Sequence, residues 1–104
     1  MAELIYQRKK SIDSISFYEV KVWEVPKSEA FPEGIKYSLV VIENDKMIIC
    51  YDNAHDKGHH RHVFGKQENI VYRGIRQLLV QFDDCVEEYK QIKKEGGVSE
   101  AKKS

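Results

Sequence analysis

Cysteine, proline and long apolar runs are all scarce in this chain of 104 residues, which has 2 cysteines and 2 prolines. Two cysteines are too few for the disulfide framework of a small secreted domain. Cys50 falls in an apolar strand pattern and Cys85 on an apolar helix face, so both are predicted to be buried free thiols. No segment approaches the roughly 20 apolar residues of a membrane-spanning helix. The first ten residues also lack the order of a signal peptide, so we expect a cytoplasmic protein without membrane contact.

An excess of charge of one sign is also missing, because 17 basic residues balance 17 acidic ones. Net charge therefore gives no argument for a nucleic-acid or membrane partner. The distribution is more informative. Residues 55–76 contain five basic residues and two acidic ones, a local charge of +3 with histidines neutral, which leaves −3 for the rest.

Strand patterns occupy the first two thirds of the chain. Residues 4–9 and 15–25 are rich in β-branched and aromatic residues, with turn residues at 11–14 between them. Residues 37–42 and 47–51 are nearly continuous apolar runs, which predicts central strands covered on both faces. Asn44-Asp45 between them favours a tight hairpin turn. Two shorter strands are expected at 60–64 and 69–73, with the intervening residues as a connection.

A helix pattern follows, with apolar residues recurring every three or four positions from Ile75 to Ile92. Lysines in the last turns and Gly96 mark its end. We predict one α+β domain over residues 1–95, a curved antiparallel sheet of about five or six strands with one long C-terminal helix packed on one face. Residues 96–104 are expected to form a flexible tail.

The four histidines of the chain, His55, His59, His60 and His62, fall within eight residues. On an extended strand, His60 and His62 lie on one face about 6.5 to 7 Å apart at the Cα, with Arg61 on the other. Such a pair can act as general acid and base near neutral pH, as RNA cleavage by its own 2′-hydroxyl requires.

We therefore assign candidate roles around this pair. The catalytic candidates are His60 and His62 as acid and base, Asp52 to orient an imidazole and Arg61 for the phosphate. The candidates for further nucleic-acid contacts are Lys57, Arg73 and Arg76, and Tyr51, Asn53 and His55 are expected to support the site.

Three other interpretations remain open for the same segment. His-x-His on a strand is a common metal-ligand pair, which Asp52 or His55 would complete. The segment is equally compatible with a docking surface without catalysis, or with a solvated loop. Trp23, Phe17 and Tyr18 are expected to be core residues rather than base-stacking platforms.

Several blocks of the chain resemble the TumE family of toxins from toxin-antitoxin modules. They are Lys36-Tyr37-Ser38-Leu39-Val40, Tyr51-Asp52-Asn53-Ala54-His55, Lys57-Gly58, His60-Arg61-His62, and the helix segment from Leu78-Leu79 to Phe82-Asp83-Asp84. The resemblance runs from about Val22 to Val86.

The resemblance implies a growth-inhibiting toxin encoded beside an antitoxin, with ribonuclease-like activity. The positions that match the family are Asp52, Asn53, His60, Arg61 and His62. We expect an antitoxin protein that covers the basic segment, RNA as the target and no cofactor, so the enzyme is expected to be a metal-independent endoribonuclease. A homodimer is possible.

Overall fold

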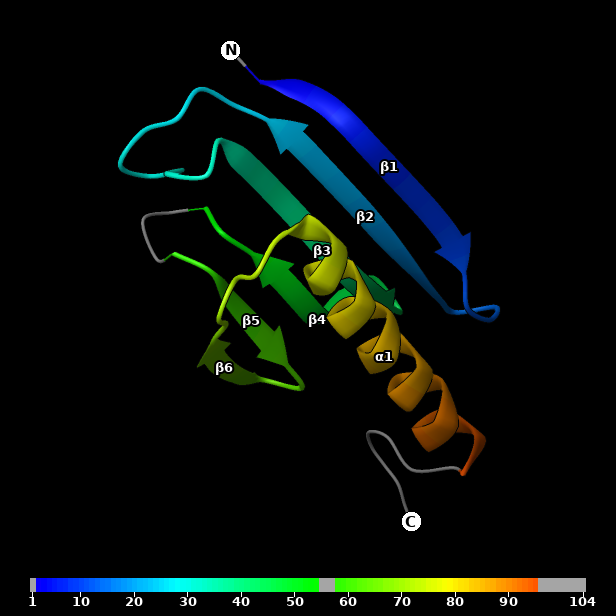
Figure 1. Ribbon diagram of the computed structural model, residues 1–104. Coiled ribbons are helices and arrows are strands. Elements are labelled where there is room, and N and C mark those ends of the chain that lie inside the picture. Colours follow the sequence, from blue (N-terminus) through cyan, green and yellow to red (C-terminus); the bar gives the residue numbers. More distant parts are fainter. Residues whose placement is uncertain (1, 55–57, 96–104) are drawn as a thin grey trace. The chain divides into compact units, whose positions relative to one another are not determined.

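The computed structural model describes residues 2–54 and 58–95. They form six strands and one helix, labelled in Figure 1. The elements are β1 (Glu3–Ser11), β2 (Ser16–Glu24), β3 (Ile35–Glu43), β4 (Lys46–Asp52), β5 (His60–Val63), β6 (Lys66–Asn69) and α1 (Ile75–Lys94). By internal contacts the chain divides into two compact units, Met1–Val71 with the strands and Tyr72–Ser104 with the helix. The predicted α+β class is confirmed.

The first unit is a single curved antiparallel sheet in which the strands follow one another in chain order, β1-β2-β3-β4-β5-β6 (Figure 1). Each strand pairs with the next one along the chain. The turn between β3 and β4 has positive φ at both Asn44 (50°) and Asp45 (65°), as expected for the tight hairpin turn predicted there.

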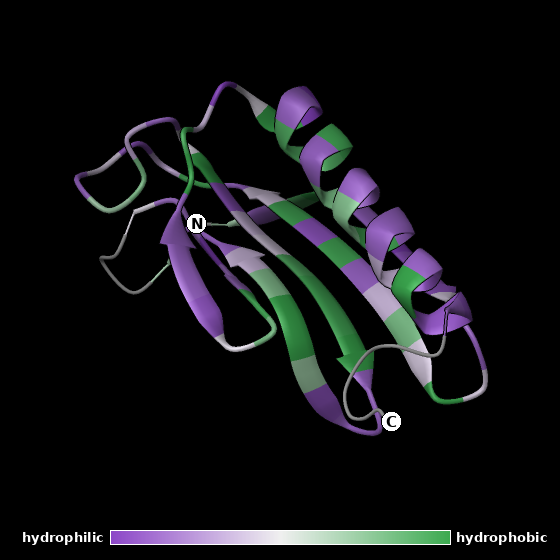
Figure 2. Ribbon diagram, turned by 90° about the horizontal axis from the view of Figure 1, so that it is seen from below, coloured by the Kyte–Doolittle hydropathy of each residue, from purple (hydrophilic) through white to green (hydrophobic). Residues whose placement is uncertain are grey.

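The sheet has two different faces, because successive side chains of a strand point to opposite sides. We call one the buried face; its fully buried residues include Val20, Val22, Tyr37, Leu39, Val41, Ile49 and Tyr51. The other, which we call the outer face, carries Phe17, Glu19, Lys21, Trp23, Lys36, Ser38, Val40, Ile42, Cys50, Asp52, His60 and His62. Figure 2 shows the resulting alternation of hydrophilic and hydrophobic positions along the long strands.

The outer face corrects two expectations from the sequence. Val40 and Ile42 on β3 are only half-buried, so this central strand is not fully covered on both faces. Of the three aromatic residues expected in the core, Tyr18 is buried, whereas Phe17 and Trp23 are half-buried on the outer face. Alternation along β2 has this effect, because position 18 faces opposite to positions 17 and 23.

The sixth strand lies earlier than predicted, at Lys66–Asn69 instead of residues 69–73. The connection from β5 is a two-residue turn, Phe64-Gly65, with φ angles of 51° and 84°. Positive φ at both positions is the geometry of a tight hairpin, so β6 begins at once. The apolar residues Ile70 to Tyr72, on which the prediction depended, lie beyond the strand.

The second unit contains α1, whose bounds agree with the predicted helix. Its buried residues are Leu78, Phe82, Val86 and Tyr89, at the three- and four-residue spacing of one helix face. Lys93 and Lys94 occupy the last turn, where cations complement the helix dipole. Among the described residues, no helix is both long enough and apolar enough to cross a membrane. The single domain over residues 1–95 stays a prediction, and the predicted tail and Gly96 lie outside the described residues.

Candidate active site

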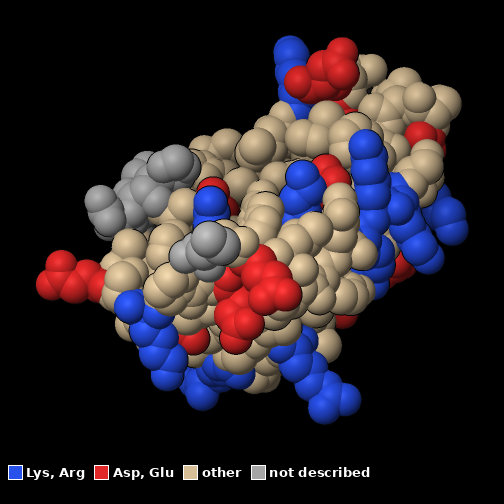
Figure 3. Space-filling view, turned by 90° about the horizontal axis from the view of Figure 1, so that it is seen from above, with Lys and Arg blue, Asp and Glu red and all other residues tan. Residues whose placement is uncertain are grey.

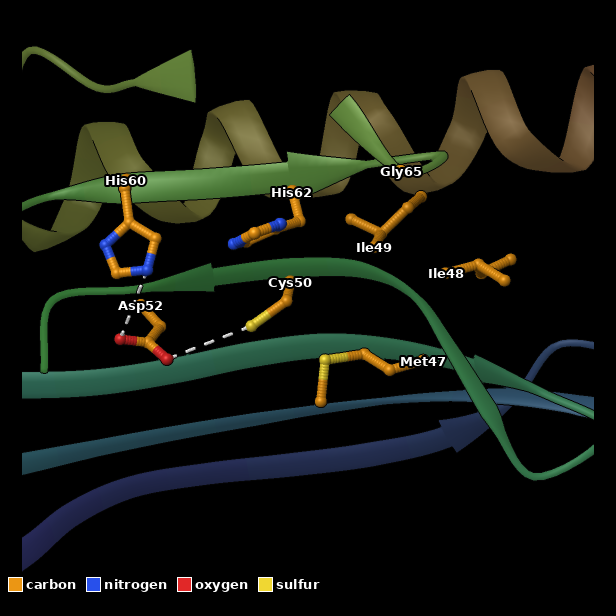
Figure 4. A pocket seen from close by; sticks show the side chains of 8 residues that line it. All are labelled: Met47, Ile48, Ile49, Cys50, Asp52, His60, His62 and Gly65. Carbon is orange, nitrogen blue, oxygen red and sulfur yellow. Dashed lines mark hydrogen bonds and ion pairs between the residues drawn. The ribbon is translucent and has the colours of Figure 1, made fainter. Parts of the chain in front are cut away.

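A hollow of about 370 Å³ opens on the outer face between β4 and β5 (Figure 4). Its polar lining consists of Cys50, Asp52, His60 and His62, and its other walls come from Met47, Ile48, Ile49 and Gly65. The register explains why these polar groups meet, because Asp52 lies opposite His60 and Cys50 opposite His62. In Figure 4 the two imidazoles point from β5 toward the side chains of β4.

His60 is the most enclosed of these groups, with 4% of its surface exposed. Its Nδ1 lies 2.9 Å from the carbonyl oxygen of Gly58, which can only accept a hydrogen bond. Nδ1 therefore carries a proton, and in the neutral ring Nε2 is the free base. Nε2 lies 3.9 Å from Asp52 Oδ1, so an added proton there would meet a carboxylate. The backbone around Gly58 thus sets both the tautomer and the orientation of His60.

Asp52 is half-buried and is held by the backbone that follows it. Its Oδ1 accepts a hydrogen bond of 2.7 Å from the amide of Ala54, the geometry of an Asx-turn. Its Oδ2 lies 4.0 Å from the thiol of Cys50. Burial, with a smaller contribution from the Asp52 charge, raises the pKa of Cys50 to about 11. Cys50 is therefore a buried free thiol in the wall of the hollow, and the sequence predicted its burial correctly.

His62 completes the site as its more accessible imidazole. Its ring centroid lies 5.7 Å from that of His60, and the two rings meet edge to face at 80°. His62 is half-buried, and no side-chain hydrogen bond joins its imidazole to another of the described residues. Its ring nitrogens are thus available to a ligand in the hollow.

Arg61 lies on the other side of the sheet, so the structure does not bring it together with His60 and His62. Its Nη1 donates a 2.9 Å hydrogen bond to the Tyr51 hydroxyl, and its Nε donates one of 2.7 Å to Glu68 Oε1. The hydrogen bond to Tyr51 and the contact with Glu68 raise the pKa of Arg61. The strand period of two places His60 and His62 on one face and Arg61 on the other, so the structure does not bring Arg61 to the histidine pair, and its contact with phosphate stays a prediction.

Asn53, expected to support the site, joins the end of β4 to the start of β3. It is 2% exposed; its Oδ1 accepts a 3.0 Å hydrogen bond from the Tyr37 amide, and its Nδ2 donates one of 2.8 Å to the Ile35 carbonyl. These side-chain bonds continue the pairing of the two strands past Asp52. Asn53 thereby fixes the point at which the chain leaves the sheet toward the histidines.

Among residues 2–54 and 58–95, no group of three His, Cys, Asp or Glu side chains is arranged to hold a metal ion. The metal site considered from the sequence therefore lacks its third ligand among the described residues, and His55, the other candidate, lies outside them. Lys57, expected on the nucleic acid, lies outside them too.

A comparison with protein-family models matches residues 3–90 to the family described as Toxin TumE. This chain belongs to the TumE family. The match covers more of the chain than the blocks that resemble the family, since it extends from β1 almost to the end of α1. No curated protein and no solved structure matches the chain. As a member of this family the TumE chain is a toxin of a toxin-antitoxin module, which implies an antitoxin partner.

The other predicted binding residues of this TumE toxin lie in the second unit. Arg73 precedes α1 and Arg76 lies in its first turn, and both side chains are exposed. Their contact with nucleic acid stays a prediction. On the molecular face in Figure 3, acidic and basic side chains are intermixed, in keeping with the balanced charge of the chain.

Two features of the site were not predicted. Gly58 has a φ of 67°, which turns its carbonyl toward His60, and a glycine two residues before His-x-His was the available signal. His59 contacts Tyr37 through Nδ1 at 2.9 Å and Glu33 through Nε2 at 3.2 Å, away from the histidine pair. These contacts join distant parts of the sequence, so no local pattern indicated them.

Proposed function

We propose that this TumE toxin is a metal-independent endoribonuclease with His60 and His62 as its general acid and base. The observation that carries the proposal is that two imidazoles 5.7 Å apart share one hollow with the carboxylate of Asp52. Acid–base chemistry near neutral pH requires two groups of this kind at one reacting centre. Membership of a toxin family supplies the biological setting.

The reaction is an attack within the RNA chain. One imidazole takes the proton of the 2′-hydroxyl while the 2′-oxygen bonds to the adjacent phosphorus. The bond from phosphorus to the 5′-oxygen breaks, and the other imidazole, in its protonated form, gives a proton to that oxygen. The products are a 2′,3′-cyclic phosphate and a 5′-hydroxyl end. One imidazole takes up a proton and the other releases one, so the two histidines balance the protons of this step and no water molecule takes part.

The surroundings of His60 and His62 differ, and this difference suits the two imidazoles to different steps of the proton transfer. A protonated His60 has Gly58 O at Nδ1 and Asp52 Oδ1 near Nε2, so both of its N–H groups face oxygen atoms. His62 has the more accessible nitrogens. We propose that Asp52 stabilises the protonated form of His60 in the reaction and that His62 exchanges its proton directly with the substrate.

The test is induced expression in a bacterial host, with growth and total RNA integrity followed in parallel. The variant His60→Gln/His62→Gln keeps the side-chain volume and polarity and removes both titrating groups. We expect it to abolish growth arrest and RNA cleavage together. His59→Gln is the matched control, because this neighbouring histidine contacts Glu33 and Tyr37 instead of the hollow, and it is expected to remain toxic.

A folded double variant that stops growth as strongly as the wild type would overturn the proposal. Growth arrest with intact RNA in the wild type would favour the docking function, in which the outer face binds a target without turnover. Thermal unfolding of both purified variants shows whether a loss of toxicity is a loss of fold.

A further inference from the structure

The hollow contains two imidazoles and a carboxylate, but a phosphate chain also needs cations. Arg61 faces away from it and is engaged by Tyr51 and Glu68. The lysines of the described outer face lie elsewhere on the same sheet, on β1, β2 and β3. They are Lys9, Lys21 and Lys36.

Two of these lysines are paired with the aromatic residues of the outer face. Lys9 Nζ lies 4.7 Å from the centre of the Phe17 ring, and Lys36 Nζ lies 5.2 Å from the centre of the Trp23 ring. Both rings are half-buried, so part of each remains accessible. Aromatic rings beside cations are the combination with which proteins bind single-stranded nucleic acids, since bases stack on the rings and phosphates contact the cations.

The strand register connects this surface to the hollow. Lys21 lies opposite Ser38, Ser38 opposite Asp52, and Asp52 opposite His60. These four residues form one row across β2, β3, β4 and β5. Neighbouring strands are about 4.8 Å apart, so Lys21 and His60 are separated by roughly 14 Å at the backbone. A chain of a few nucleotides spans that distance.

The second row reaches the other imidazole. It runs from Lys9 through Glu19, Val40 and Cys50 to His62. Trp23 and Lys36 form the next row on the other side of Lys21, nearer the β1 start. Lys21 and Lys9 are thus aligned with His60 and His62, while Trp23 with Lys36 and Phe17 lie in the rows that flank them on the same face.

The charge of this part of the outer face suits a polyanion. On β1, β2 and β3 it has three lysines and one glutamate, Glu19. Glu19 accepts a 3.1 Å hydrogen bond from Gln7 and lies 3.9 Å from Lys21, so its charge is partly compensated. The Lys21 side chain remains 39% exposed.

We propose that the outer face of β1, β2 and β3 binds single-stranded RNA and leads it across the sheet to His60 and His62. Bases stack on Phe17 and Trp23, and phosphates contact Lys9, Lys21 and Lys36. The choice of RNA rests on the proposed ribonuclease function; the binding surface itself rests on the contacts and register above. Flexible single strands suit a sheet face because their bases can be unstacked and spread on it.

The experiment measures binding separately from cleavage. The probe is a fluorescein-labelled 12-nucleotide RNA with 2′-O-methyl groups, which cannot react by 2′-attack, and the readout is fluorescence anisotropy at several salt concentrations. The test variant is Lys9→Gln/Lys21→Gln/Lys36→Gln. The matched control, Lys10→Gln/Lys46→Gln/Lys66→Gln, removes the same charge from exposed lysines that are not in the outer-face rows.

We expect the test variant to bind roughly tenfold more weakly at low salt, and the control variant to bind almost as the wild type does. Three lost phosphate contacts should also reduce the slope of log affinity against log salt by about 2. The chain has a single tryptophan, so its fluorescence reports on Trp23 alone. Stacking predicts that the probe quenches this emission with the same midpoint as the anisotropy change.

Equal affinity of the two triple variants, or unchanged tryptophan emission at saturation, would overturn the proposal. A surface that binds the antitoxin protein instead of RNA would give the first of these results. The outcome is distinct from that of the ribonuclease test. Lysine-dependent binding without cleavage of unmodified RNA would support the surface and contradict the catalysis, whereas cleavage with lysine-independent binding would do the reverse.

Discussion

At the end of β4, two consecutive polar residues, Asp52 and Asn53, point to different surroundings. Asp52 faces the hollow, and Asn53, one residue later, is buried and hydrogen-bonded to the backbone of β3. The sequence indicated that short polar residues after an apolar strand cap or turn the chain, which is the role of Asn53. It did not indicate the partners, because Ile35 and Tyr37 are more than fifteen residues away.

Replacing Asn53 by alanine is expected to destabilise the fold by roughly 2 to 4 kcal/mol. The amide of Tyr37 and the carbonyl of Ile35 would lose their partner, and an unpaired buried polar group costs about 1 to 3 kcal/mol. Urea unfolding with an unchanged m-value measures the difference. Asn69→Ala, at an exposed position of β6, is the control. Equal stability of the two variants would contradict the assigned role.

At the scale of elements, the sequence predicted the faces of β5 but not the position of β6. The period of two correctly predicted that His60 and His62 share a face and that Arg61 lies opposite. The partner of Arg61 was missed because β6 was expected at residues 69–73, which left Glu68 in a connection. In the structure Glu68 lies directly across the ladder from Arg61. An aromatic residue with positive φ, Phe64, made the turn hard to anticipate.

The Arg61–Glu68 pair predicts a pH-dependent stability of β6. The hydrogen bond from Arg61 lowers the pKa of Glu68 below its ordinary value of 4.5. A lowered carboxyl pKa stabilises the folded state above the unfolded-state pKa, and the contribution is lost as the pH falls through the folded-state pKa. We therefore expect amide protection factors in β6 to decrease on acidification below about pH 4.5 in the wild type.

Glu68→Gln should lower these protection factors a few-fold at neutral pH and remove their change in acid. Hydrogen exchange with mass spectrometry measures both effects. Glu24→Gln, at an exposed site at the end of β2, should leave β6 unchanged. A wild-type β6 whose protection does not respond to acid would show that the pair contributes nothing to the hairpin.

At the scale of the whole molecule, the sequence predicted the α+β class correctly but did not predict that one face of the sheet is only partly covered. Apolar runs in β3 and β4 favoured strands covered on both sides, but Val40 and Ile42 are half-buried on the outer face. Residue type alone cannot distinguish a covered face from a binding surface, since both favour apolar and aromatic side chains. The register places that face in continuity with the histidine pair, which is what gives it a function in our account.

The most direct test of that account is an RNA cleavage assay with the purified chain in the presence of EDTA. We predict cleavage that EDTA does not suppress, products with 2′,3′-cyclic phosphate and 5′-hydroxyl ends, and loss of at least about 10³-fold in rate in a folded His60→Gln/His62→Gln variant, since each proton-transfer group typically contributes 10² or more. Cleavage that requires a metal, products with 5′-phosphate ends, or full activity in the double variant would contradict it.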